Sequence, residues 1–163
     1  ISFSKLDLVN AYLQLLLDET SKQYTTINTH KGLFQYKWLP FGVSIAPAVL
    51  QRAMETLLPG CTHTCIYFDD IVVTGQTTEE HLNNLGAVLA KWEAAGLKLN
   101  RNKCVFMAPS VEYLGHRIYK NGLHPTEEQV KCIKEAATPQ NVTELKAFLG
   151  LVMRGFFHTL QLS

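Results

Sequence analysis

Asp69 and Asp70 stand side by side between two short apolar runs rich in β-branched residues, at 64–66 and 71–73. Aspartate tolerates the backbone of a tight turn and the flanking residues favour extended chain, so the segment predicts a β-hairpin with both carboxylates at its tip. Adjacent like charges repel, and a divalent metal ion such as Mg²⁺ or Mn²⁺ is the usual compensation, because these ions prefer carboxylate oxygens. A solvated acidic turn is the plainer interpretation, and for two aspartates alone it is the favoured one.

A third aspartate, Asp7, ends a run with alternating apolar residues at 1–8, which is typical of a strand. Phosphoryl transfer with two metal ions needs carboxylates that converge from separate strands, one of them bridging the ions. An aspartate at a strand end and a pair at a hairpin tip meet this need if the two strands are neighbours in one sheet. Many proteins carry three such aspartates, so the spacing alone is weak evidence.

The composition is that of a folded domain, with 47% apolar and 18% charged residues in a chain of 163. These fractions exclude a disordered chain, and the length suits one domain with a sizeable core. No apolar run approaches the ~20 residues that span a bilayer, and no signal-peptide pattern is present. The net charge of +1 is low for a nucleic-acid binder, although basic residues exceed acidic ones in 91–163 and could approach phosphates there.

The cysteines are Cys61, Cys65, Cys104 and Cys132. Cys61, His63 and Cys65 suggest zinc, but their spacing is not a standard zinc spacing, and in a strand the three would simply share one face. Because the cysteines show no pairing pattern, we expect reduced thiols, as in a cytosolic protein.

The rest of the pattern mixes strands and helices. Residues 23–27 and 33–38 are rich in β-forming residues around a turn at 30–32, which predicts a second hairpin. Further strands are expected at 105–106 and 111–118.

Several helix signals follow one another along the chain. Ser44 can cap a helix that runs to about Leu58, before Pro-Gly ends it. Thr77 with Glu80 is a capping-box pattern that opens a longer helix. Its apolar stripe, expected in the core, is Leu82, Leu85, Leu89 and Trp92. Two more helices are expected, at 126–137 and from 141 onward.

Five motifs occur in a characteristic order, at 7–12, 39–47, 67–70, 96–104 and 113–116. Asp-Leu-Val-Asn-Ala-Tyr, Leu-Pro-Phe-Gly-Val-Ser-Ile-Ala-Pro, Tyr-Phe-Asp-Asp, Gly-Leu-Lys-Leu-Asn with Lys-Cys, and Tyr-Leu-Gly-His together resemble the reverse transcriptase of a long-terminal-repeat retrotransposon. With phenylalanine in Leu-Pro-Phe-Gly, the motif resembles the gypsy-type branch, because retroviruses usually carry Gln at that position. The resemblance covers nearly the whole chain.

The resemblance implies an α+β fold, a right-hand polymerase palm whose antiparallel sheet is backed by the helices at 44–58 and 77–95. It assigns residues 1–122 to the palm, with part of the fingers at about 13–43, and residues 123–163 to the start of a truncated thumb or connection. The implied activity is that of an RNA-directed DNA polymerase, a nucleotidyltransferase that adds deoxyribonucleotides to a primer 3′-hydroxyl by a two-metal mechanism.

The resemblance also implies roles for residues around two Mg²⁺ or Mn²⁺ ions. Asp7 and Asp69 would bind both ions, Asp70 would be a further ligand, and Leu8 would offer its backbone carbonyl. Lys103 matches the lysine proposed as the acid for the pyrophosphate leaving group, although a single lysine is usually a solvated surface residue.

A second group of residues would bind the nucleotide and the primer. Tyr12 would place its ring under the incoming sugar and exclude a 2′-hydroxyl, whereas the plainer interpretation is a buried core tyrosine. Phe41 would pack against the nucleotide, or instead plug the core. The nucleotide-binding set is Leu8, Asn10, Ala11, Tyr12, Phe41 and Gly42. The primer-binding set is Tyr67, Tyr113, Leu114, Gly115 and His116.

The implied partners are an RNA or DNA template-primer, deoxyribonucleoside triphosphates, and the fingers, RNase H and integrase regions of a polyprotein. No membrane partner is expected. The expected location is the cytoplasm, in a virus-like particle or nucleoprotein complex.

The chain departs from the family in two places. It begins at the first catalytic aspartate, without the basic upstream fingers, and Met153-Arg154-Gly155 replaces the usual Asn-Tyr-Tyr. We therefore expect this chain alone to be inactive. One alternative is a non-catalytic relic or domesticated nucleic-acid-binding module of the same fold. The other is a structural protein-interaction domain that uses residues 126–163.

Overall fold

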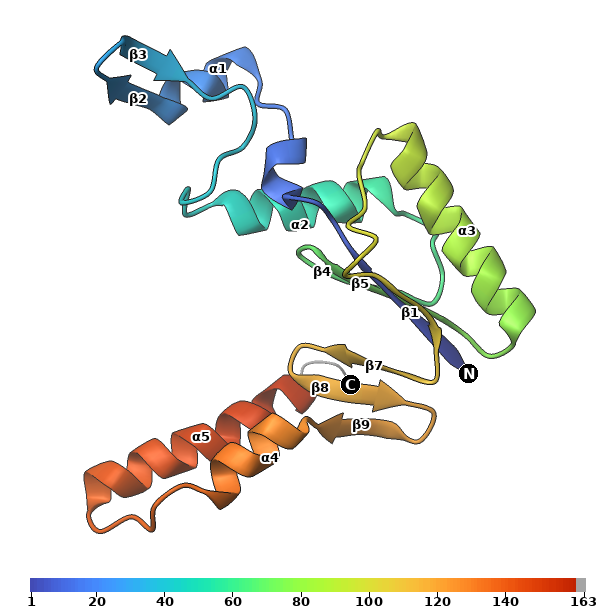
Figure 1. Ribbon diagram of the computed structural model, residues 1–163, viewed down its shortest axis with the longest axis vertical. Coiled ribbons are helices and arrows are strands. Elements are labelled where there is room, and N and C mark those ends of the chain that lie inside the picture. The colour runs from blue at the N-terminus through green and yellow to red at the C-terminus, as the bar shows by residue number, and fades with distance from the viewer. Residues whose placement is uncertain (161–163) are drawn as a thin grey trace. The chain divides into compact units, whose positions relative to one another are not determined.

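The computed structural model of the protein describes residues 1–160, with the side chains of all of these except 128, 129, 151 and 153–160. The chain forms two compact units, Ile1–Met107 and Ala108–Ser163. Helices and antiparallel sheets occur in both units (Figure 1), so the predicted α+β class is confirmed. No described helix is long and apolar enough to cross a membrane.

The first unit is built on a four-stranded sheet with the order β4-β5-β1-β6. Its strands are β4 (Thr64–Tyr67), β5 (Asp70–Gly75), β1 (Ser2–Asp7) and β6 (Val105–Ala108). β1 and β5 are antiparallel, with Leu6 opposite Ile71 and Asp7 opposite Asp70. The two segments that carry the predicted metal ligands are therefore neighbours in one sheet, as the sequence analysis required.

Two helices pack on this sheet, α2 (Ala46–Leu57) and α3 (Thr78–Ala94) (Figure 1). Their apolar faces join the strands in one core, because side chains at alternate strand positions lie on the same face of a sheet. The fully buried members of this core are Leu6, Leu50, Met54, Ile71, Val73, Val88 and Trp92.

The beginning of α2 differs from the prediction. The residue before the helix is Ile45, not Ser44, and no side chain caps the end. Pro47 lies in the first turn, where its missing N–H costs nothing and its fixed φ favours the helix. The prediction of a Ser44 cap is therefore wrong, while the end near Leu58 is confirmed.

The predicted cap of α3 is confirmed, because Thr77 Oγ1 accepts a hydrogen bond from the Glu80 N–H at 3.1 Å. Its buried stripe differs from the prediction in two residues, because His81 and Val88 are buried in place of the predicted Leu82 and Leu89, and Leu89 is only partly buried. The buried residues are His81, Leu85, Val88 and Trp92, whereas Leu82 is 52% exposed. His81 takes the core position because a buried hydroxyl, Ser4 Oγ, lies 2.8 Å from its Nε2.

Residues 11–38 form small elements outside the main sheet. They are η1 (Ala11–Gln14), α1 (Glu19–Lys22), η2 (Gln23–Thr25), β2 (Thr26–Thr29) and β3 (Gly32–Gln35). The second predicted hairpin is confirmed as β2–β3, although the 3₁₀ turn η2 occupies much of the predicted first strand. Two backbone hydrogen bonds, 2.9 and 3.0 Å long, join residues 15–17 to residues 37–39 and so hold the two ends of this segment together.

The second unit has a three-stranded antiparallel sheet, β7 (Ser110–Tyr113), β8 (His116–Tyr119) and β9 (Gly122–Pro125), followed by α4 (Glu127–Lys134) and α5 (Val142–Leu160). The predicted run 111–118 is two strands with a turn between them. β9 was not predicted, and it ends in Pro125 because a proline is tolerated at the end of an edge strand. The division between palm and thumb at 122/123 stays a prediction, and the side chains of the sequence departure at 153–155 lie outside the described residues.

Candidate active site

The hairpin β4–β5 ends in a two-residue turn formed by Phe68 and Asp69, with Tyr67 paired to Asp70 across it. Phe68 has φ of 55°, in the left-handed region that a large side chain rarely adopts. Such a backbone persists only where the surrounding structure fixes it, and strained residues of this kind gather at functional sites. Asp69 therefore follows a backbone kink that has to be held in place.

Gln51, on α2, holds this turn, and the sequence analysis missed it. Its Oε1 accepts a hydrogen bond from the Phe68 N–H at 2.7 Å. The predicted motif ended at residue 47, and no spacing rule would have related a helix amide to a turn in another hairpin.

Asp7 ends β1 and is only 9% exposed. Its Oδ2 lies 3.7 Å from Lys103 Nζ, and its buried Oδ1 has no hydrogen-bond partner among the described residues. Burial raises the pKa of the Asp7 carboxyl, nearby Lys103 lowers it, and the charges of Asp69 and Asp70 raise it again, against a smaller lowering by Lys5. The result is a site with negative charge that the neighbouring cations do not fully offset.

Asp70 has a different environment from Asp7. Lys5 Nζ lies 3.0 Å from Asp70 Oδ1, and both side chains are partly buried. Lys5 and Asp7 share one face of β1, because side chains alternate along a strand. Asp70 thus has a counter-charge supplied by the same strand that carries Asp7, and the sequence analysis also missed this lysine.

These carboxylates fit a divalent cation in their chemistry. The unpartnered Asp7 Oδ1 and the mutual repulsion of three aspartates favour a hard cation with oxygen ligands. In the described part of the chain, no three His, Cys, Asp or Glu side chains gather closely enough to hold a metal. The ligand set of Asp7, Leu8, Asp69 and Asp70 therefore stays a prediction.

The segment 98–104 contacts the backbone of Asp7 and Leu8. Leu8 forms a β-bridge with Leu99, and the Asn100 N–H donates to the Asp7 carbonyl at 2.9 Å. The Asp7 N–H in turn lies 3.4 Å from Cys104 Sγ. This framework brings Lys103 beside Asp7, although the lysine side chain is 68% exposed.

The side chain of Gln14 makes a second set of hydrogen bonds to the segment 98–104. Gln14 Nε2 donates to the Lys98 carbonyl at 3.0 Å and also bonds the Val9 carbonyl. Its Oε1 accepts from the Lys98 N–H at 2.6 Å. Gln14 thereby connects the residues that follow Asp7 with the segment that carries Lys103. No pattern in the sequence predicted this role.

The predicted nucleotide residues Tyr12 and Phe41 come together in space. Their ring centroids are 5.2 Å apart, with an interplanar angle of 86°. This edge-to-face contact is a favoured aromatic arrangement. Tyr12 packs against the core but is only half-buried, whereas the plainer interpretation was a buried tyrosine, and Phe41 is 61% exposed and does not plug the core.

Asn10, Ala11 and Gly42 shape the backbone around these two rings. Asn10, just before η1, has φ of 46°, and Ala11 is buried. Gly42 has φ of 87°, which a residue with a side chain would adopt only with strain. The turn at Gly42 follows Phe41 directly.

The predicted primer residues fall in both units. Tyr67 is in the first, where its ring lies against Phe68 with centroids 4.4 Å apart. The other four form the β7–β8 turn of the second unit, with Tyr113 paired to His116. Leu114 and Gly115 have φ of 52° and 75°, as in a tight hairpin turn with two left-handed residues.

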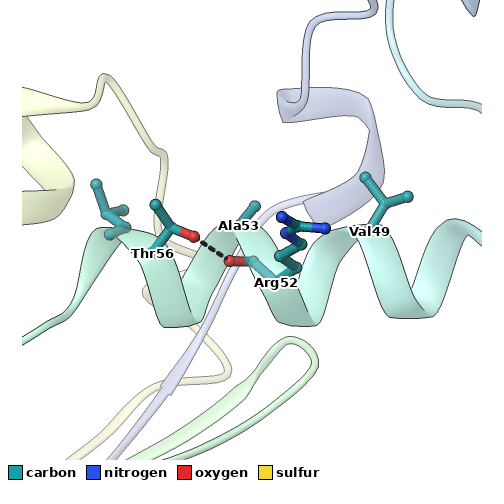
Figure 2. Close-up of a pocket in the computed structure, with 5 residues that line it drawn as sticks. Val49, Arg52, Ala53 and Thr56 are labelled. Atoms are coloured by element: carbon teal, nitrogen blue, oxygen red, sulfur yellow. Dashed lines mark hydrogen bonds between the residues drawn. The ribbon is translucent and has the colours of Figure 1, made fainter.

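A separate open groove runs along α2, lined by Val49, Arg52, Ala53, Thr56 and Leu57. Figure 2 shows these side chains and the hydrogen bond from Thr56 Oγ1 to the Arg52 carbonyl, 2.7 Å long. None of the predicted site residues lines this groove. It is therefore distinct from the aspartate site.

A family model described as Reverse transcriptase (RNA-dependent DNA polymerase) matches residues 1–118. Among curated proteins, the chain is 36% identical over 151 residues to the Retrovirus-related Pol polyprotein from transposon 297 of Drosophila melanogaster. It is 32% identical over 152 residues to the Transposon Tf2-3 polyprotein of Schizosaccharomyces pombe. These alignments cover 91% and 92% of the chain, which spans only 14% and 11% of the two polyproteins.

Solved structures share the fold. The foamy viral protease-reverse transcriptase dRH in complex with double-stranded DNA is 27% identical, with a TM-score of 0.80 over 92% of this chain and 26% of that one. The foamy viral protease-reverse transcriptase in complex with an RNA/DNA hybrid is 27% identical, with a TM-score of 0.76 over 92% of this chain and 20% of that one. The chain belongs to the reverse transcriptase family, with homologues in retrotransposon and retroviral Pol polyproteins.

Proposed function

We propose that this chain is the palm core of an RNA-directed DNA polymerase from a gypsy-type long-terminal-repeat retrotransposon, and that it adds deoxyribonucleotides to a primer 3′-hydroxyl. The observation that carries the proposal is the register of β1 and β5, which pairs Asp7 with Asp70 beside the Asp69 turn. The gypsy-type assignment rests on Phe41 in the Leu-Pro-Phe-Gly motif.

The aspartates hold two Mg²⁺ or Mn²⁺ ions in this proposal. Asp7 and Asp69 supply carboxylates and Leu8 its backbone carbonyl, while Asp70 adds negative charge and remains paired with Lys5. Bound ions of this kind activate a hydroxyl nucleophile and neutralise the charge of a triphosphate. Lys103, next to Asp7, donates the proton that the departing pyrophosphate needs.

The aromatic pair selects the sugar of the incoming nucleotide. Tyr12 closes the space that a 2′-hydroxyl would need, with Asn10, Ala11 and Gly42 shaping the backbone around it. Phe41 contacts the nucleotide on its exposed side and supports the Tyr12 ring on the other.

Tyr67 and the turn at 113–116 contact the primer end. Residues 1–122 form the palm, with part of the fingers at about 13–43, and residues 123–163 begin a thumb or connection. The template-primer is RNA or DNA, and the DNA and RNA/DNA complexes of the foamy viral enzyme support this partner class. In this proposal the chain acts in a cytoplasmic nucleoprotein particle, together with other regions of the polyprotein.

The 163-residue chain by itself is expected to extend primers poorly. Phosphoryl transfer depends mostly on positioning and charge stabilisation, and losing one preorganised donor commonly costs ~10²–10³ in rate. The chain spans 14% or less of the two polyproteins described above.

Primer extension on an RNA template with Mg²⁺ and deoxyribonucleotides tests the proposal, in a polymerase that includes this chain. Extension that requires Asp7 and Asp69 supports it. Nucleic-acid binding without extension would instead support a non-catalytic module of the same fold. Capture of a protein partner that survives loss of all three aspartates would support an interaction domain.

A further inference from the structure

The side-chain amide of Gln51 bonds the aspartate turn on two sides. Its Oε1 accepts from the Phe68 N–H at 2.7 Å, and its Nε2 lies 3.3 Å from the Ile66 carbonyl. One amide thus contacts the end of β4 and the first residue of the turn. Asp69 is the next residue along the chain.

Glu55 sets the orientation of this amide. Glu55 Oε1 accepts from Gln51 Nε2 at 2.8 Å, one helical turn further along α2. Because a carboxylate can only accept, it requires the NH₂ group of Gln51 on its side and directs the carbonyl oxygen towards Phe68. The pair therefore presents an acceptor to the Phe68 N–H in the turn.

The helix beneath Gln51 is fixed in the core. Leu50 and Met54, on either side of Gln51 along α2, are almost completely buried. The backbone that Gln51 holds is a strained one, since Phe68 has φ of 55°. A fixed donor–acceptor group that supports a strained turn is what preorganisation of a carboxylate requires.

We propose that Gln51, oriented by Glu55, is a positioning residue that fixes the Phe68–Asp69 turn and thereby the Asp69 carboxylate. The inference rests on the proposed function, because it assigns Gln51 a part in the same metal site. The helix α2 also begins soon after Phe41 and Gly42. One helix thus connects the nucleotide-contacting loop with the turn that carries a metal ligand.

Gln51→Met tests the proposal, because methionine keeps the length of the side chain and removes its hydrogen bonds. In a polymerase that includes this chain, we expect kcat to fall by about 10- to 100-fold, since small misplacement of a reacting group is costly. We expect the Mg²⁺ concentration for half-maximal rate to rise, with little change in the KM for template-primer. Gln76→Met is the matched control, because the exposed Gln76 side chain makes no hydrogen bond in the described part of the chain.

A swap of the two side chains separates positioning from general stability. Gln51→Glu leaves two carboxylates facing each other and should impair the rate more than Gln51→Met. The double variant with Gln51→Glu and Glu55→Gln restores one donor to the pair and an acceptor for the Phe68 N–H. We expect it to recover part of the lost Mg²⁺ affinity, which a merely structural role would not predict.

Hydrogen exchange of the 163-residue chain provides a readout that needs no activity. In Gln51→Met, the Phe68 amide should exchange ~10-fold faster or more, while the Leu6 amide in the core keeps its rate. A parent without polymerase activity but with this change would defeat the proposed function and leave the positioning role standing. Unchanged Phe68 exchange in Gln51→Met, or unchanged Mg²⁺ dependence in an active parent, would overturn the positioning role.

Discussion

Asp7 and Asp70 face each other across neighbouring antiparallel strands, yet their carboxylates have opposite surroundings. Asp70 pairs with Lys5 at 3.0 Å, while Asp7 is nearly buried, lies 3.7 Å from the exposed Lys103, and has one oxygen without a partner among the described residues. The same pair of strands therefore gives one aspartate a close ion pair and leaves the other with the more distant, exposed Lys103 as its counter-charge. The sheet register, rather than the Asp-Asp sequence alone, creates this difference.

Removing the Asp7 charge should stabilise the metal-free protein. Burial and two neighbouring aspartates disfavour the carboxylate, and the pairing with the exposed Lys103 is weak compensation. We expect Asp7→Asn to raise the free energy of unfolding by ~1 kcal/mol at pH 7, measured by urea denaturation without divalent ions. Millimolar Mn²⁺ should then stabilise the parent and leave the variant unchanged. A variant less stable than the parent without metal would contradict this account of the site.

Loss of the Lys5 side chain should strengthen cation binding. Lys5 supplies the counter-charge of Asp70, so Lys5→Met leaves a more negative site. We expect several-fold tighter Mn²⁺ binding by titration calorimetry, together with lower stability when no metal is present. Lys91→Met, on α3, is the matched control and should leave Mn²⁺ affinity as it is. Weaker binding in Lys5→Met would show that the lysine organises the site.

The aromatic pair should control sugar selection. Tyr12→Ala removes the ring that closes the space for a 2′-hydroxyl, and we expect ribonucleotide use relative to deoxyribonucleotide use to rise on the order of tenfold. Phe41→Ala removes the edge contact and should raise it less. Competition assays on an RNA template measure both, with the exposed Tyr24→Ala as control. Unchanged discrimination in Tyr12→Ala would return Tyr12 to the role of a core residue.

Stability should fall at mildly acidic pH through His81. Burial lowers the pKa of His81 from its ordinary 6.5, so the unfolded chain binds a proton that the folded chain resists. The stabilising contribution is therefore full above pH 6.5 and is lost as the pH falls through the window between 6.5 and the lowered pKa. Melting curves from pH 8 to pH 5 should show this loss in the parent, and about as much in the exposed His30→Gln control. A variant with His81→Leu should lose this part of the pH dependence, and a parent whose stability is flat over the window would contradict the prediction.

Local sequence patterns predicted the hairpins and the capped helix α3 well. The hairpin around the aspartates and the Thr77 cap depend on neighbouring residues only, and both elements occur where they were expected. The turn itself is Phe68–Asp69, however, and Asp70, predicted at the tip, is the first residue of β5. Leu82 was assigned to the core because the leucine stripe has helical spacing, and the stripe that is buried, which contains His81, also has helical spacing. The choice was decided by Ser4 on a distant strand, which provides a partner for His81.

In the candidate site, too, the sequence predicted what depends on local motifs and missed what depends on contacts between distant residues. The order of the motifs indicated which residues to consider, and two of them, Tyr12 and Phe41, are in contact, while the roles of the whole set stay predictions. Gln51, Lys5 and Gln14 were missed because their roles depend on hydrogen bonds and ion pairs between elements distant in sequence. No spacing rule links a helix glutamine to a turn amide in another element, so only the folded structure relates Gln51 to Phe68.

Primer extension by an Asp69→Asn variant tests the central claim most directly. Asparagine keeps the shape of the side chain and removes the charge that would bind a metal ion. In an active polymerase that includes this chain, we predict that Asp69→Asn reduces the Mg²⁺-dependent extension rate by ~10³-fold or more. The melting temperature should stay within a few degrees of the parent, and Glu93→Gln on the exposed face of α3 should extend normally. Extension by Asp69→Asn at the rate of the parent would contradict the account.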